Sequence, residues 1–211
     1  MKRLWSPDRV AALGVFSQEG LSVGLQEVMQ ATRAVAGELT FAGLKTPLTV
    51  MTADLNAQQP APVREGRVGE ALCAGMTIPG MAPPYIRGAQ RLVDGIAIMP
   101  VPTAAVRQAG ADIAIAINLL SRETLAAWPT EAPPPPAQRK SSRMLDPVIE
   151  TLIMLQMDES IRHAAEADVV ITPRFGPMSW RDFYLADLAR EAGRQAAEEQ
   201  LPCLLNQVKP S

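Results

Sequence analysis

The chain has 211 residues, of which 47% are hydrophobic, and its 20 basic and 22 acidic residues give a net charge of −2. This length and composition predict one domain with a hydrophobic core. The near-neutral charge argues against a nucleic-acid partner, because such proteins present a basic face. The single histidine excludes His-rich metal sites, and Cys73 and Cys203 lack the spacing of metal ligands. We therefore expect neither a metal nor another cofactor.

Nothing in the sequence predicts export or a membrane span. No window reaches the roughly 18 uninterrupted apolar residues of a transmembrane helix. The segment MKRLWSPDRV is not followed by the apolar stretch of a signal peptide. We expect a cytoplasmic protein, free or peripheral to a membrane, with its cysteines as reduced thiols and a disulfide as the alternative.

The first third of the chain predicts a helix, a strand and a second, shorter helix. Apolar residues at spacings of three and four predict a helix that ends at Gly37. Its apolar face comprises Leu21, Leu25, Val28, Met29, Thr32 and Val35. The run LTVMTADL predicts a strand, and the proline-broken residues 56–66 predict a surface loop. Val68, Leu72 and Met76 share a four-residue spacing, which predicts a short helix. Its small residues would let it pack close to a neighbouring backbone; they are Ala71, Cys73, Ala74 and Gly75.

A strand–helix–strand pattern follows. Residues 91–94 predict a strand end, and the Asp94-Gly95 pair between apolar runs is typical of a hairpin turn. TAAVRQA predicts a helix that begins after Pro102 and ends at Gly110. IAIAIN then predicts a parallel strand that is buried on both faces. This order is typical of a βαβ unit.

The last third predicts a loop and two long helices. The proline-rich residues 129–143 predict a solvated loop or linker, with a peptide for a proline-recognising partner as the alternative. The helix from Met144 has a broad, Met-rich apolar face, which we interpret as a core face, with a lipid- or partner-facing surface as the alternative. VVIT predicts a strand. Ser179 and Asp182 fit a capping box for a final helix, whose apolar face comprises Leu185, Leu188, Ala189, Ala192 and Ala196.

Several pieces occur in an order that resembles the patatin-like phospholipase family, in its bacterial subgroup related to neuropathy target esterase. They are ALCAGMTIPG, MAPP, VDG, MPV and AGADIAIAI, with LKTPLTVMTADL before them and ADVVITPRFGPMSWRDFYLADLAREAGRQAAEEQL after them. The resemblance covers the chain from about Leu39 onward and matches the downstream portion of the domain. It implies an α/β fold, namely a partial patatin-like three-layer domain whose mainly parallel central sheet is flanked by helices.

The resemblance also implies a lipid acyl-ester hydrolase with a Ser–Asp dyad. Asp94 matches the aspartate of the family's Asp-Gly motif, so it would be the general base, and Gly95 would form the tight turn. A carboxylate acts as such a base when it lies within hydrogen-bond reach of the serine and is partly shielded from water. A dyad needs no histidine, and we interpret His163, the only residue that a Ser-His-Asp triad could use, as a helix-surface residue.

The sequence departs from the family pattern at two places. The family follows Asp-Gly with glycine or alanine, where this chain has Ile96. The family's nucleophile lies in Gly-x-Ser-x-Gly after an apolar strand. Ser22 satisfies the pattern in GLSVG, but FSQE precedes it, so Ser22 is a weak candidate nucleophile, and a helix N-cap is the alternative.

Residues 1–211 therefore predict a single, incomplete patatin-like domain that carries the aspartate part of an active site. The expected partners are a lipid or acyl-ester substrate, in solution or at a membrane surface, and a separate chain that supplies the upstream half. The alternative is a non-catalytic scaffold or interaction module that has lost the serine, whose unpaired strand edges would invite another chain. A nucleotide-binding α/β module is a third alternative, but the sequence lacks its glycine-rich phosphate loop.

Overall fold

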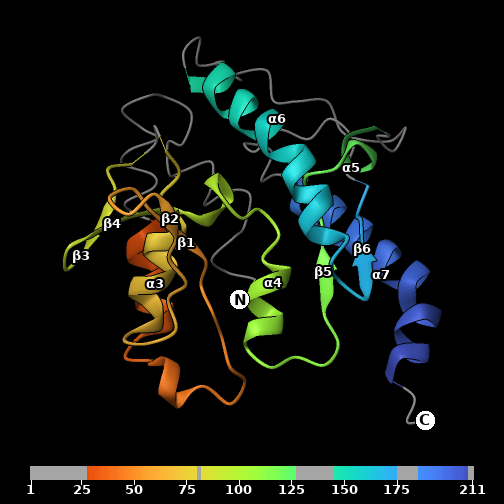
Figure 1. Ribbon diagram of the computed structural model, residues 1–211, viewed down its shortest axis with the longest axis horizontal. Coiled ribbons are helices and arrows are strands. Elements are labelled where there is room, and N and C mark those ends of the chain that lie inside the picture. The colour runs from red at the N-terminus through yellow and green to blue at the C-terminus, as the bar shows by residue number, and fades with distance from the viewer. Residues whose placement is uncertain (1–27, 80–81, 127–144, 175–184, 209–211) are drawn as a thin grey trace. The chain divides into compact units, whose positions relative to one another are not determined.

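The computed structural model describes residues 28–79, 82–126, 145–174 and 185–208. These residues divide between two compact units, Met1–Met99 with Gln138–Glu150, and Pro100–Ala137 with Thr151–Ser211. Both units combine helices with strands, so the coarse expectation of a mixed helix-and-strand fold is confirmed (Figure 1). The single incomplete domain and the three-layer arrangement stay predictions. The proline-rich stretch 129–143, the capping box at Ser179 and the candidate nucleophile Ser22 lie outside the described residues.

The first unit contains a four-stranded sheet in the order β2-β1-β4-β3. Its strands are β1 (Thr52–Asp54), β2 (Gln59–Pro60), β3 (Tyr85–Arg87) and β4 (Gln90–Asp94), and all neighbours are antiparallel. The expectation of a mainly parallel sheet is therefore wrong for this unit. The short connections between β1 and β2 and between β3 and β4 allow hairpins but no parallel crossover. β1 and β4, which are joined by a longer segment that includes α3, also pair antiparallel.

The segment 56–66, expected as a surface loop, is partly built into this sheet. It supplies β2, and beyond it Val63 bridges Val50 through two backbone hydrogen bonds of 3.0 and 2.9 Å. Val63 belongs to a hydrophobic core under the sheet. The core's buried members are Phe41, Val63, Val68, Ala71, Ala74 and Leu92.

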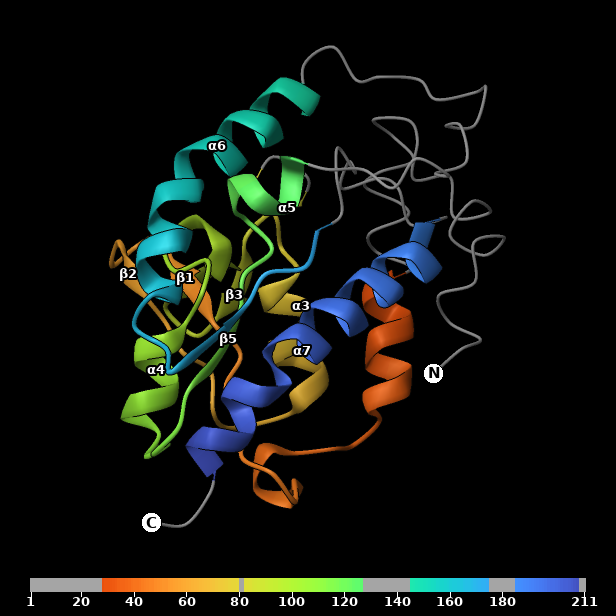
Figure 2. The same ribbon diagram turned by 90° about the vertical axis from the view of Figure 1, so that its right-hand side faces the viewer.

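The first unit also has a helix over residues 28–36, the 3-10 turns η1 (Phe41–Gly43) and η2 (Gly95–Ala97), and helix α3 (Val68–Gly75). Gly37 ends the first helix with a φ of +54°, which confirms the expected stop. The helix over 28–36 lies beside α3 (Figure 2), where the Cys73 thiol donates to the Met29 carbonyl. Val35, expected on the apolar face, is 62% exposed.

The second unit contains a parallel pair of strands, β5 (Ile115–Ile117) and β6 (Val169–Ile171) (Figure 1). Its helices are α4 (Thr103–Gln108), α5 (Arg122–Ala126), α7 (Ala186–Val208) and most of α6 (Leu145–Ala164). The strands on either side of α4 are β4 and β5, which belong to different sheets. The expected βαβ unit is therefore not formed within one sheet.

Burial in the second unit differs from the expected pattern at two elements. β5 was expected to be buried on both faces, but Ile115 and Ile117 are 49% and 59% exposed. The broad apolar face of α6 is only partly a core face, because Met154 and Leu155 are about two-thirds exposed. Of the apolar face expected for the final helix, Ala196 on α7 and Leu185, which directly precedes α7, are buried, whereas Leu188, Ala189 and Ala192 are partly buried. Among the described helices, none combines the length and apolar character that a bilayer crossing requires.

Candidate active site

Asp94 is the last residue of β4 and the N-cap of η2. Its backbone N–H donates to the carbonyl of Thr77, just beyond α3, at 2.9 Å. Its side-chain Oδ1 accepts the backbone N–H of Ile96, also at 2.9 Å. The residue is thus held at both its main chain and its side chain. Since η2 follows it, Asp94-Gly95 does not connect two paired strands, and the hairpin-turn interpretation is wrong.

Thr52 on β1 is the register partner of Asp94. Because paired residues of antiparallel strands project to the same face, the two side chains are neighbours. Thr52 is fully buried, and its hydroxyl donates to the carbonyl of Ala61 on the other side of β1. The Thr52 hydroxyl proton is therefore committed to Ala61 and is not donated to the Asp94 carboxylate.

Gly95 lies directly against the main chain of Met51. A Cβ atom at position 95 would stand 2.7 Å from the Met51 carbonyl oxygen and 2.8 Å from its carbon. Real Cβ atoms essentially never approach backbone atoms so closely. The glycine of the Asp-Gly pair is therefore required by a close approach of two main chains, and its role in a tight turn stays a prediction.

Burial raises the pKa of the Asp94 carboxyl, and the hydrogen bond from Ile96 partly opposes this effect. The pKa of Asp54, on the neighbouring strand β1, is shifted in the opposite direction. The backbone N–H of Asn56, foremost, and that of Arg91 donate to its carboxylate and hold its pKa below the usual range. Two carboxylates of one sheet thus differ in character: Asp54 is stabilised as an anion, whereas Asp94 has raised basicity.

Ile96, which departs from the family pattern after Asp-Gly, donates the hydrogen bond that holds the Asp94 carboxylate. The hydrogen bond comes from the main-chain N–H, which every residue except proline supplies. The isoleucine side chain is consequently not needed for this contact, and its presence does not prevent it.

The described residues do not bring a serine to Asp94. Ser22 lies outside them, and among them the hydrogen bond to the carboxylate is the one from Ile96. Ser121 and Ser160 are buried in the second unit and bond to Thr124 and Asn118 there. His163 was expected on the helix surface, but its side chain is only 19% exposed and lies 3.7 Å from Glu159.

Sequence reasoning missed two residues that hold the Asp94-Gly95 pair, namely Met51 and Thr77. Gly75 was expected to let its helix pack closely, and a Cβ atom there would stand 2.9 Å from Val50 Cγ1. The contributions of Met51 and Thr77 are made by carbonyl groups, which every residue carries, so no side-chain pattern could reveal them.

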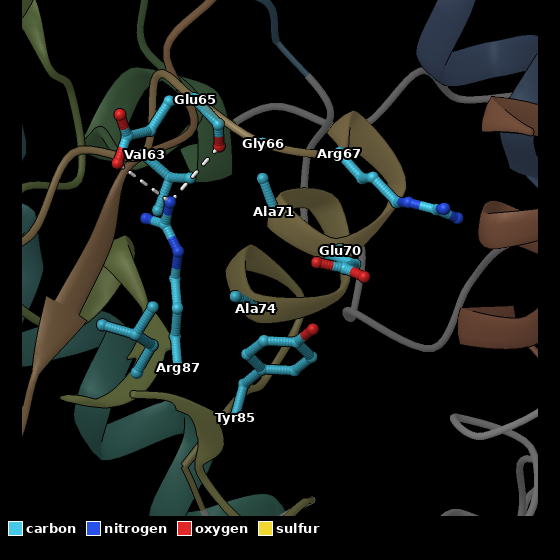
Figure 3. A pocket seen from close by; sticks show the side chains of 10 residues that line it. Val63, Glu65, Gly66, Arg67, Glu70, Ala71, Ala74, Tyr85 and Arg87 are labelled. Carbon is cyan, nitrogen blue, oxygen red and sulfur yellow. Dashed lines mark hydrogen bonds and ion pairs between the residues drawn. The ribbon is translucent and has the colours of Figure 1, made fainter. Parts of the chain in front are cut away.

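A small pocket lies elsewhere in the same unit (Figure 3). Its floor is apolar, and on its rim Arg87 pairs with Glu65 at 3.5 Å. The cavity measures about 30 Å³, which is room for about one water molecule. Asp94 does not line it. The pocket is therefore too small for an acyl chain or a head group. The described residues also contain no cluster of His, Cys, Asp and Glu that could hold a metal ion.

Comparison with known proteins gives a partial match. No protein-family profile matches the chain. The chain is 28% identical over 121 residues to three proteins named as uncharacterised NTE family proteins, one from Mycobacterium bovis and two from strains of Mycobacterium tuberculosis. The match covers 57% of this chain and 31% of each relative, so the similarity spans under a third of the relatives' length. It agrees with the resemblance at the level of the family name.

Proposed function

We propose that this chain carries the general base of a patatin-like lipid acyl-ester hydrolase, and that Asp94 is this base. The observation that carries the proposal is the state of the Asp94 carboxyl. Oδ1 is fixed by the Ile96 N–H, and burial raises the pKa of the group. A base with raised pKa is better matched to proton transfer near neutral pH than an ordinary carboxylate. The similarity to proteins named for the NTE family supports the same class of reaction.

The proposed reaction uses the two carboxylate oxygens of Asp94 differently. A serine Oγ attacks the acyl carbonyl carbon while Asp94 Oδ2, which accepts no hydrogen bond from a described residue, takes the serine proton. Collapse of the tetrahedral intermediate releases the alcohol part of the ester, which receives that proton from Asp94. Water then hydrolyses the acyl-serine, with Asp94 again acting as the base and regenerating the free hydroxyl.

The proposal requires a serine within hydrogen-bond reach of Asp94. Ser22 is the candidate in this chain, and a serine of a separate chain is the alternative. Gly95 has a supporting role in either case, because its contact with Met51 fixes the turn that presents the carboxylate.

The test compares Asp94→Asn with Asp54→Asn in hydrolysis of short p-nitrophenyl esters and of a lysophospholipid. General-base catalysis is worth about 10²–10⁴-fold, so Asp94→Asn should reduce turnover by about that factor. Asp54→Asn is the matched control, since Asp54 lies on the paired strand and is a structural acceptor. Equal turnover in the wild type and Asp94→Asn would remove Asp94 from the mechanism.

A second candidate function, a non-catalytic interaction module, is favoured by one observation on β5. Ile115, Ile117 and Leu119 are each about half exposed, and within the described residues β5 pairs with β6 alone. An apolar strand edge without charges or proline is a ready site for pairing with another chain. Hydrogen exchange of residues 114–119 as a function of protein concentration discriminates the two functions. Protection that grows with concentration, in a protein without esterase activity, would favour the interaction module.

A further inference from the structure

Gly75, the last residue of α3, is packed against the strand segment that carries Met51. A Cβ atom at position 75 would stand 2.9 Å from Val50 Cγ1 and 3.7 Å from the Met51 carbonyl oxygen. Val50 has little room to move away, because its backbone is bonded to Val63 on the other side. Its side chain also packs on the core of the first unit. An added methyl group at position 75 would therefore displace the Val50–Met51 segment.

The Val50–Met51 segment also contacts the Asp94-Gly95 turn. Met51, the residue after Val50, is the one whose main chain touches Gly95. A second connection runs along the main chain, because α3 leads from Gly75 to Thr77, whose carbonyl accepts the Asp94 N–H. Gly75 and Asp94 are thus linked by two independent sets of contacts, although they are not in contact themselves.

We infer that Gly75 is a positioning residue for Asp94: its lack of a side chain seats the Val50–Met51 segment, and that segment holds the Asp94-Gly95 turn in place. The kinetic consequence of this inference rests on the proposed function, but the structural coupling does not.

The second glycine of α3 provides a matched control. A Cβ atom at Gly69 would stand 3.2 Å from the Ala36 Cβ and 3.4 Å from the Arg33 Cα, both in the helix over 28–36. Gly69 is therefore also tightly packed and also helical, but it faces a different neighbour. A purely structural effect of a glycine-to-alanine change in α3 should appear at both positions, whereas coupling to Asp94 should appear at Gly75 alone.

The experiment is a carbon-13 NMR titration of the Asp94 carboxyl in the full chain, which needs no catalytic turnover. Among the described residues, the pKa shift of Asp94 has two causes, burial and the Ile96 N–H, and neither is a charged side chain. The neighbouring Thr52 and Thr77 are uncharged. In Gly75→Ala, displacement of the turn admits water, so the pKa of the Asp94 carboxyl should fall toward the usual range. Gly69→Ala should leave it unchanged.

A rescue variant completes the design. In Gly75→Ala/Val50→Ala, the space left by the Val50 methyl groups accepts the new Cβ, so the Asp94 pKa should return toward that of the wild type. Val50→Ala alone loosens the same contact without adding volume, so it keeps the test usable if Gly75→Ala fails to fold. It should shift the pKa in the same direction as Gly75→Ala.

Three results would overturn the inference: an unshifted Asp94 pKa in folded Gly75→Ala, an equal shift in Gly69→Ala, or an unshifted pKa in Val50→Ala. Ester turnover separates this inference from the proposed function. If Asp94 is the base, Gly75→Ala should also lower kcat about 10-fold, because small misplacements of a catalytic group are costly. A shifted pKa without esterase activity, both in this chain alone and with a separate chain that supplies the upstream half, would keep the coupling and refute the function.

Discussion

The main chains of Gly95 and Met51 touch, so that a Cβ atom at position 95 would lie 2.7 Å from the Met51 carbonyl oxygen. The nearest partner atoms are backbone atoms of Met51, the residue before β1, which cannot rotate away as a flexible side chain could. The Asp94-Gly95 turn is therefore specified by a tertiary contact and not only by the preference of glycine for turns.

Gly95→Ala should consequently destabilise the first unit. Overpacking of this kind costs about 1–3 kcal/mol, so the midpoint of urea denaturation should fall accordingly. Gly43→Ala is the control, because a Cβ atom there would meet only the Thr40 hydroxyl at an ordinary 3.5 Å. Similar midpoints for the two variants would contradict the close approach.

The raised pKa of Asp94 predicts that its ionised form costs stability. When the folded-state pKa exceeds the unfolded one, this cost is present above the folded pKa and disappears as the pH falls through it. Asparagine never ionises and retains an acceptor for the Ile96 N–H. Asp94→Asn should therefore be more stable than the wild type at pH 7, and the gain should vanish in acid.

Asp54→Asn should change the stability of the protein in the opposite direction. The lowered pKa of Asp54 contributes stability above its unfolded pKa, and this contribution is lost as the pH falls through the folded pKa. The variant should thus be less stable than the wild type at pH 7, with a difference that shrinks in acid. Thermal denaturation of all three proteins between pH 3 and 7 measures both effects, and parallel curves would exclude the assigned shifts.

A buried polar cluster should dominate local stability in the second unit. Asn118, which follows β5, accepts hydrogen bonds from the Ser160 hydroxyl and the Leu120 N–H. The side chains of Asn118 and Ser160 are nearly inaccessible to water. Asn118→Ala leaves the buried Ser160 hydroxyl and the partly buried Leu120 N–H without their acceptor and should cost about 2–4 kcal/mol. Ser160→Ala removes one donor and should cost about 1 kcal/mol. Equal losses measured by urea denaturation would mean that Asn118 is not the centre of the cluster.

An isoleucine-to-threonine change should cost more stability in β6 than in its parallel partner β5. Ile117 and Ile171 are register partners, yet Ile117 is 59% exposed and Ile171 is 7% exposed. Ile171→Thr loses buried methyl groups and buries a hydroxyl, which should cost about 2 kcal/mol. Ile117→Thr should stay within about 0.5 kcal/mol of the wild type. A large loss at Ile117 would indicate that something covers β5 in solution.

Elements defined by local signals could be predicted from the sequence. Gly37 and Gly110, both at positive φ, mark helix ends that their position in the pattern had indicated. The spacing in α3 and in α7 predicted their helices, because periodicity survives whatever the helix packs on. The end of β4 at Asp94 was likewise predicted, since a Gly follows an apolar run.

Pairing between elements could not be predicted in the same way. The hairpin of β3 and β4 turns at Gly88-Ala89, which is a weak turn signal, and β3 directly follows two prolines, so β3 did not stand out. The apolar alternation in β5 could not tell a strand covered on both faces from one with an open face. The contacts of Met51 with Gly95 and of Gly75 with Val50 join residues far apart in the chain, and only tertiary structure reveals them.

The central claim is that Asp94 activates a serine for attack on an ester. The most direct measurement is the rate of labelling by a fluorophosphonate, followed by mass spectrometry of the intact chain and its peptides, for the wild type, Asp94→Asn and Asp54→Asn. The account predicts a single serine adduct whose formation slows by about 10²-fold or more in Asp94→Asn and is unchanged in Asp54→Asn. An adduct that forms equally fast in Asp94→Asn would contradict it. So would the absence of any serine adduct, both in this chain alone and with a separate chain that supplies the upstream half.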